Sequence, residues 1–150
     1  FNVKLTTATT NVTQGALITL NHYNSELLDT DNAFDLSTGR FTPQTAGKYY
    51  FEFSCHCYAG SSVSDLKMCY GVIYKNGSSG SNSSQTAIQQ LDCRNHYGYG
   101  MTVNANGIFD MNGSSDYVYT AIKIQTNSGS TPVIAGESAY TWFRGYKLIT

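Results

Sequence analysis

The sequence predicts an all-β fold, a β-sandwich or jelly roll, and three observations lead to this prediction. Short segments of strand-like composition follow one another, and turn signals separate them about every ten residues. No segment sustains apolar residues at the i, i+3, i+4 and i+7 positions of a helix. Charged residues make up only 13% of the 150 residues, and Ser, Thr, Asn and Gly supply the polarity, as is typical of β-rich chains with many turns.

The pattern of apolar residues and the turn signals between them predict where the strands and loops begin and end. Residues 1–15, rich in Thr and Asn, predict a lead-in from a stalk or shaft, and residues 16–150 predict one head domain. The predicted strands are residues 16–23, 33–36, 39–43, 48–58, 66–75, 86–95, 99–103, 108–111, 117–125 and 140–149. Exposed polar loops are expected at residues 78–84 and 126–132.

Charge and hydropathy exclude two classes of partner. Nine Lys and Arg residues against ten Asp and Glu give a formal net charge of -1, and nucleic-acid binders need a basic footprint that this chain lacks. No apolar run approaches the ~18 residues of a membrane span, so we expect no membrane insertion. The chain starts at Phe1 without an initiating methionine or a signal peptide, which predicts a piece of a longer protein.

Two predicted strands are apolar on both faces, which is unusual for an antiparallel sheet that packs on one side only. Residues 140–149 carry large side chains on both faces, and so do residues 66–75. In so short a chain, the second cover is expected from another subunit. The candidate interface residues are Tyr70, Tyr74, Tyr140, Trp142, Tyr146 and Leu148. The alternative is that tyrosines tolerate exposure and need no partner.

Two separated blocks of sequence carry a resemblance to a known family. The first block is Ala33-Phe34-Asp35, then Gly39-Arg40-Phe41-Thr42-Pro43, Gly47 and Tyr49-Tyr50-Phe51-Glu52-Phe53. The second block is Trp142-Phe143-Arg144-Gly145-Tyr146-Lys147-Leu148-Ile149. In this order they resemble the globular heads of the complement C1q family and the wider tumour necrosis factor (TNF)-like fold. The signature core residues are Phe41, Gly47, Tyr49, Phe51, Phe53, Phe143 and Gly145.

The resemblance implies a ten-strand jelly roll that assembles as a tight homotrimer, with the closing strand near the three-fold axis. Such heads cap a stalk or shaft. Calcium near the trimer axis is known in the family, but no acidic cluster here matches it, so no cofactor is expected. The low charge and the Asn, Ser, Thr and Gly content are similar to viral or bacterial versions, which places the chain on a virion as a phage or virus fibre head; the alternative is an extracellular, secreted protein.

Four cysteines are the main candidates for chemistry. Cys55 and Cys57 share one face of a strand while His56 points the opposite way, so a tetrahedral metal site would need Cys69 and Cys93 beside them. Three alternatives stay open: buried free thiols, a cross-strand disulfide, or a metal site.

Hydrolase signals are poor, because no Gly-x-Ser-x-Gly or His-Glu-x-x-His motif occurs and the three histidines lie in unrelated segments. The most binding-like segment holds Asn95, His96, Tyr97 and Tyr99, because glycines let its tyrosines stand clear and tyrosines stack on sugar rings. The alternative is a turn packed on a neighbouring strand or subunit.

These observations predict a non-enzymatic trimeric head that attaches to a cell-surface receptor or glycan through several copies of a weak site. The second hypothesis is a structural module for trimerisation or capsid decoration without an external ligand. The third is a small carbohydrate-processing enzyme.

Overall fold

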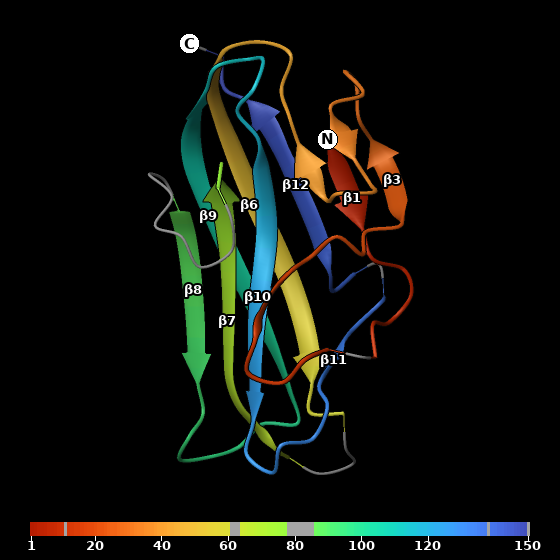
Figure 1. Ribbon diagram of the computed structural model, residues 1–150, viewed down its shortest axis with the longest axis vertical. Coiled ribbons are helices and arrows are strands. Elements are labelled where there is room, and N and C mark those ends of the chain that lie inside the picture. The colour runs from red at the N-terminus through yellow and green to blue at the C-terminus, as the bar shows by residue number, and fades with distance from the viewer. Residues whose placement is uncertain (11, 61–63, 78–85, 138, 150) are drawn as a thin grey trace.

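The computed structural model describes residues 1–10, 12–60, 64–77, 86–137 and 139–149. Over these residues the chain is all-β, with twelve strands in two antiparallel sheets that pack as a sandwich with the jelly-roll fold, as Figure 1 shows. Within these ranges no helix is present, and hence none that is long and apolar enough to cross a membrane.

Sheet A is built around a long central strand, β6. Its members are β1 (Asn2–Lys4), β3 (Ser25–Leu28), β6 (Gly47–Tyr58), β9 (Gly100–Met111), β11 (Val133–Ile134) and β12 (Trp142–Lys147). β9 pairs with all twelve residues of β6 on one side, and β12 followed by β11 pairs with β6 on the other. β1 and then β3 continue the sheet beyond β12.

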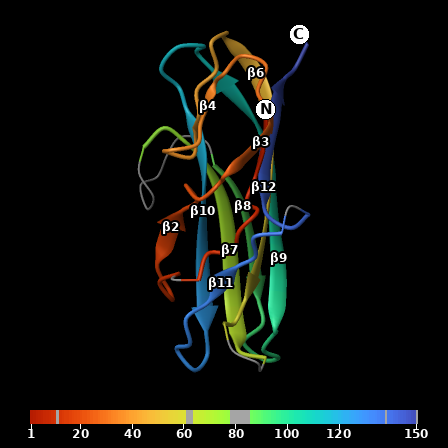
Figure 2. The same ribbon diagram turned by 90° about the vertical axis from the view of Figure 1, so that its right-hand side faces the viewer.

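Sheet B is built around β10 and β7. Its members are β2 (Leu17–Thr19), β4 (Phe34–Asp35), β5 (Arg40–Phe41), β7 (Leu66–Lys75), β8 (Thr86–Asp92) and β10 (Val118–Thr126). β8, β7 and β10 are neighbours, and β5 and β2 share the other edge of β10. Figure 2 shows the sandwich from the side, with β2 and β10 in one layer and β9 and β12 in the other.

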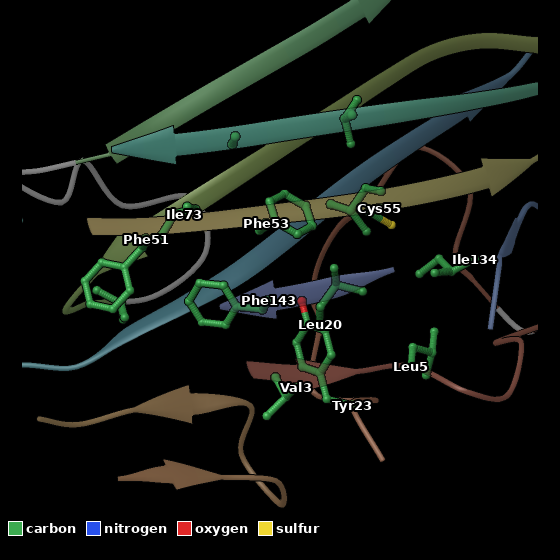
Figure 3. Packing of buried hydrophobic residues seen from close by; sticks show 14 of the residues in the cluster. Val3, Leu5, Leu20, Tyr23, Phe51, Phe53, Cys55, Ile73, Ile134 and Phe143 are labelled. Atoms are coloured by element: carbon green, nitrogen blue, oxygen red, sulfur yellow. The ribbon is translucent and has the colours of Figure 1, made fainter. Parts of the chain in front are cut away.

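The core between the sheets is aromatic, as the alternation along β6 predicts. Phe51 and Phe53 of β6 and Phe143 of β12 have no exposed surface, and Figure 3 shows them beside Val3, Leu20 and Tyr23. The ring centroids of Phe51 and Phe143 lie 6.1 Å apart. The prediction of an aromatic core is confirmed for Phe41, Tyr49, Phe51 and Phe53, all of which are buried.

Glycine is required at two of the signature positions. A Cβ atom at Gly145 would lie 2.8 Å from the backbone oxygen of Tyr50 and would overlap the ring of Phe51. Gly39 has a φ of 70°, where an added Cβ would come within 2.9 Å of the Asn21 Cα. Gly145 therefore allows β6 to approach closely, and Gly39 adopts a backbone conformation that favours glycine.

The structure differs from the expected lead-in over residues 1–15. β1 pairs with both β12 and β3, and Val3, Leu5 and Val12 are buried. The Gly15 N–H then donates to the Ile124 carbonyl at 2.8 Å, so the segment passes from sheet A to sheet B. Phe1, Val3 and Leu5 alternate with polar residues as in a strand, but the run is short and the Thr- and Asn-rich stretch that follows it favours a lead-in over a strand.

Three strand predictions also change. Residues 99–103 and 108–111 belong to one strand, β9, because the polar residues between them lie on its outer face and stay paired with β6. β3 and the two-residue β11 were not expected, since neither carries a clear alternation. The loop predicted at residues 78–84 lies outside the described residues.

Candidate functional site

The outer face of sheet A carries an exposed apolar row that crosses three strands. Tyr146 of β12 pairs directly with Tyr50 of β6, which pairs with Ile108 of β9. Tyr146 is 61% exposed and Ile108 is 59% exposed, and the two tyrosine rings are 5.5 Å apart. We call this row, with the rows beside it on the same three strands, the sheet A face.

The charged residues of the sheet A face neutralise one another. Arg144 of β12 forms an ion pair with Glu52, its direct partner on β6, and its guanidinium lies 4.1 Å from the ring centre of Trp142. One row beyond the tyrosines, Lys48 pairs with Asp110 at 2.6 Å. The face is therefore partly apolar, and its two ion pairs balance in charge.

A groove of about 580 Å³ lies beside the tyrosine end of this face. Its walls come from β12, β6, β1 and the residues that follow β3, and they include Leu28, Tyr50 and Tyr146. Carboxylates and cations line it as well, but no histidine or cysteine does. It therefore offers no nucleophile paired with a histidine base.

A cluster of four aromatic rings, those of His56, Tyr58, Tyr99 and Tyr140, lies at the other end of the sheet A face. The His56 Nδ1 is hydrogen-bonded to the Thr102 Oγ1 at 2.6 Å, and the His56 ring contacts the rings of Tyr58 and Tyr140. Tyr99 extends the group, with its ring centroid 5.7 Å from that of Tyr58. Burial lowers the pKa of His56, against the smaller opposing charge of Glu137.

On the outer face of sheet B, the apolar residues of β7 and β10 are covered from within the chain, while Ile88 of β8 stays exposed. Val72 and Tyr74 of β7 and Tyr119 of β10 are buried there, and the Tyr74 and Tyr119 rings stack at 5.4 Å. Tyr117 packs against the same cluster, with the Arg40 guanidinium 4.3 Å from the centre of its ring. Burial raises the pKa of Tyr119 to about 12.

The predicted interface residues thus lie on two opposite outer faces. Tyr140, Trp142 and Tyr146 belong to the sheet A side, and the Leu148 N–H, just after β12, donates to the Lys48 carbonyl at 2.8 Å. Tyr70 and Tyr74 belong to the sheet B side, with Tyr74 only 5% exposed. The outer face of the closing strand is uncovered at Tyr146, whereas the outer face of β7 is covered within the chain.

The predicted ligand-binding residues, Asn95, His96, Tyr97 and Tyr99, lie in the connection between β8 and β9, and all four are exposed. Between the tyrosines, Gly98 exchanges two backbone hydrogen bonds with Leu66. Both termini lie towards one end of the sandwich and this connection lies at the other, which we call the distal end (Figure 1).

Asp65 anchors the distal end, and nothing in the sequence marked it. Its buried carboxylate accepts hydrogen bonds from the Ser128 Oγ at 2.6 Å and the Ser130 Oγ at 2.7 Å, which tie the segment after β10 to the start of β7. These hydrogen bonds lower the pKa of Asp65. An isolated aspartate and two serines in polar loops give no pattern that would reveal this contact.

The cysteines face the core. Cys55, Cys57 and Cys69 are buried and Cys93 is partly buried, all as free thiols. The Cys57 and Cys69 Sγ atoms are 2.8 Å apart, whereas Cys93 lies beside the Met101 sulfur at 4.0 Å. Across the described ranges, no three His, Cys, Asp or Glu side chains gather as a metal site would require.

Comparisons with known proteins agree with this architecture. The C1q domain family matches residues 1–146, so the chain belongs to the C1q family. Among solved structures, the crystal structure of murine APRIL at pH 5.0, a TNF-like protein, is similar with a TM-score of 0.61 at 11% identity, over 98% of this chain and 96% of that one. Murine APRIL at pH 8.0 is similar with a TM-score of 0.60 at 10% identity and the same coverage. No curated protein sequence matches the chain.

Membership of this class confirms the predicted C1q/TNF-like family and jelly roll. Domains of the class are generally non-enzymatic ligand-binding domains, typically trimeric, receptor-binding and extracellular or secreted.

Proposed function

We propose that this chain is the non-enzymatic, homotrimeric head of a phage or virus fibre, displayed on the virion, and that it attaches the fibre to a cell-surface receptor or glycan. The observation that carries the proposal is the placement of exposed tyrosines at the end of the sandwich opposite to the termini. A shaft joined at the N-terminus would hold these tyrosines at its outermost point.

Trimer formation is proposed to use the sheet A face. The exposed row of Tyr146, Tyr50 and Ile108 supplies apolar area, and the Arg144–Glu52 pair removes the cost of burying an unpaired charge. Sheet B supports the same choice, because the apolar outer residues of β7 and β10 already have a cover within the chain and Ile88 of β8 is exposed beside them.

Ligand contact is proposed for the distal connection between β8 and β9. Tyr97 and Tyr99 offer rigid rings for stacking on sugars or on a receptor, and Asn95 and His96 offer hydrogen-bonding groups beside them. The backbone hydrogen bonds of Gly98 to Leu66 hold the loop, which lowers the entropy lost on binding. Three copies on one rigid head would raise the avidity by ~10²-fold or more.

The test combines a mass measurement with a binding measurement. Native mass spectrometry should give one species of three chains of 16.4 kDa each. The trimer should bind a glycan array or host cells, and Tyr97→Ala with Tyr99→Ala should reduce that binding at least tenfold.

Ile88→Ala is the matched control, because Ile88 is an exposed apolar residue of β8 on the outer face of sheet B. It should change neither mass nor binding. A folded trimer that binds no glycan and no cell would instead support the structural module. A folded monomer would overturn the multivalent mechanism.

A further inference from the structure

Two buried thiols from opposite sheets meet in the core. Cys57 lies near the end of β6 in sheet A, and Cys69 lies in β7 of sheet B. Neither residue has exposed surface, and their Sγ atoms are 2.8 Å apart. Because a disulfide bond is ~2.05 Å long, the two sulfurs need to move by less than about 1 Å to bond. We propose that Cys57 and Cys69 form a disulfide that links the two sheets of the sandwich.

The surroundings favour this pair over the other cysteine pairs. Cys55 also points into the core from β6, but it lies two residues further back along the strand. Cys93 is partly exposed after β8, and its sulfur contacts Met101. The Cys57 sulfur, by contrast, directly contacts the sulfur of Cys69.

The bond would form by thiol–disulfide exchange with a small-molecule disulfide such as oxidised glutathione. The two thiols lose two protons and two electrons as the sulfur–sulfur bond forms, and the glutathione disulfide is cleaved to two thiols. The hydrogen-bond contact with Cys57, and then burial, raise the pKa of the Cys69 thiol in the folded chain, which disfavours the reactive thiolate. The exchange therefore belongs to folding, before the two sheets close over the sulfurs.

The disulfide would brace the distal end. Cys57 and Cys69 flank the connection between β6 and β7, and both ends of that connection hold the tyrosine loop. The Ala59 N–H donates to the Tyr99 carbonyl at 3.1 Å, and the Leu66 N–H donates to the Gly98 carbonyl at 2.8 Å. A covalent link at this point would reduce relative motion of the sheets beneath Tyr97 and Tyr99, whether or not the loop binds a ligand.

The test is a count of free thiols and a peptide map of the full chain, refolded with reduced and oxidised glutathione. Alkylation after unfolding without reductant should modify two of the four cysteines. Trypsin separates Cys69 (residues 68–75) from Cys93 (residues 76–94) and from the pair Cys55 and Cys57 (residues 49–67). The map should show residues 49–67 linked to residues 68–75.

Serine variants assign the sulfur atoms. Cys55→Ser should keep the link, which identifies Cys57, and Cys93→Ser should keep it as well. Cys57→Ser should lose it. Reductant should lower the Tm of the unmodified sequence by about 5–10 °C and leave that of Cys57→Ser unchanged.

Two results would overturn the proposal. One is four alkylated cysteines in a chain that circular dichroism shows to be folded after oxidative refolding. The other is a link from Cys69 to Cys55 or Cys93. If Cys57→Ser fails to fold, the peptide map of the unmodified sequence still decides, since it requires no variant.

Discussion

The outer faces of the two sheets differ in how far their apolar side chains are buried within the chain. Both β7 and β12 carry large apolar residues on the side away from the core. On sheet B, Tyr74 and Tyr119 stack on each other and are buried with Val72. On sheet A, Tyr146 and Ile108 stay exposed in a row that continues across β6. On sheet B the cluster on β7 and β10 is covered within the chain, with Ile88 of β8 exposed at its side, whereas the sheet A row is uncovered and is the proposed trimer interface.

This difference shows what can be inferred from the pattern of apolar residues along a strand. A strand with two apolar faces needs two covers, but its pattern does not say where the second one comes from. For β7 the second cover includes Leu17 and Tyr117, which are distant in sequence and reach the cluster from β2 and from the residue before β10. Only the three-dimensional arrangement separates such a case from an interface.

The largest effect should come from removing a ring on the covered face. Tyr74→Ala empties a buried site and should lower the free energy of unfolding by about 3 kcal/mol. Tyr146→Ala removes an exposed ring and should cost the isolated chain less than about 1 kcal/mol.

Urea unfolding at several protein concentrations distinguishes the two roles. The Tyr74→Ala shift should be the same at every concentration, whereas the Tyr146→Ala shift should depend on concentration because it acts through assembly. If Tyr146→Ala lowered the free energy of unfolding as much as Tyr74→Ala does, and equally at every concentration, the two faces would not differ in the way described.

A matched pair of isoleucines gives the next largest effect. Ile108 on sheet A and Ile88 on sheet B are both more than half exposed, at 59% and 54%. Ile108→Glu places a charge in the proposed interface and should weaken the trimer at least tenfold, while Ile88→Glu should leave it intact. Native mass spectrometry over a dilution series measures this. Dissociation by Ile88→Glu alone would move the interface to sheet B.

The fold could be predicted from local pattern where residues alternate strongly, and less well where pairing partners are distant. The alternation along β6 predicts its buried apolar residues, Ser54 is also buried on the opposite set, and β7 has the predicted bounds. The sequence did not predict β1, because the alternation of Phe1, Val3 and Leu5 is short and the strand is stabilised by β12, about 140 residues later in the chain. The same holds for residues 104–107, where Asn104, Asn106 and Gly107 suggest a break that pairing with β6 prevents.

The candidate site was only partly predictable, for the same reason. The exposure of Tyr97 and Tyr99 agrees with the glycines around them. The contact of Asp65 with Ser128 and Ser130 joins loops more than 60 residues apart, and no local pattern encodes it. Spacing placed Cys57 in the core, but the nearness of Cys69 depends on how the two sheets pack.

A smaller effect should come from the charges of the sheet A face. Arg144→Ala leaves Glu52 without its partner in the proposed interface and should weaken the trimer severalfold, and adding Glu52→Gln should recover part of the loss. The Lys48–Asp110 pair is the control, because its side chains are 53% and 64% exposed and Lys48→Ala should have almost no effect. Equal effects at both sites would mean that the Arg144 row is not buried in the trimer.

The smallest effect is a pH dependence at the distal end of the sheet A face. Burial lowers the pKa of His56 relative to the unfolded chain, so the unfolded chain binds more protons between the folded-state pKa and ~6.5. The contribution of His56 to stability is therefore complete above pH ~6.5 and is lost as the pH falls below that value. Glu137 opposes this shift, and the rings of Tyr58 and Tyr140 cover the imidazole.

The measurement is the urea midpoint at pH 7.5 and pH 5.5 for the unmodified sequence, for His56→Gln and for His96→Gln. His56→Gln should reduce the drop in midpoint on acidification, because glutamine has no proton to gain, whereas His96→Gln, in the exposed loop, should keep it. Carboxylates common to all three chains cancel in this difference. If the aromatic group is buried further by trimer formation, the His56 contribution should also grow with protein concentration, since a neutral imidazole is then more strongly preferred in the assembled state. A drop that is identical in all three chains would show that His56 stays open to water and that the sheet A face ends before it reaches the distal tyrosines.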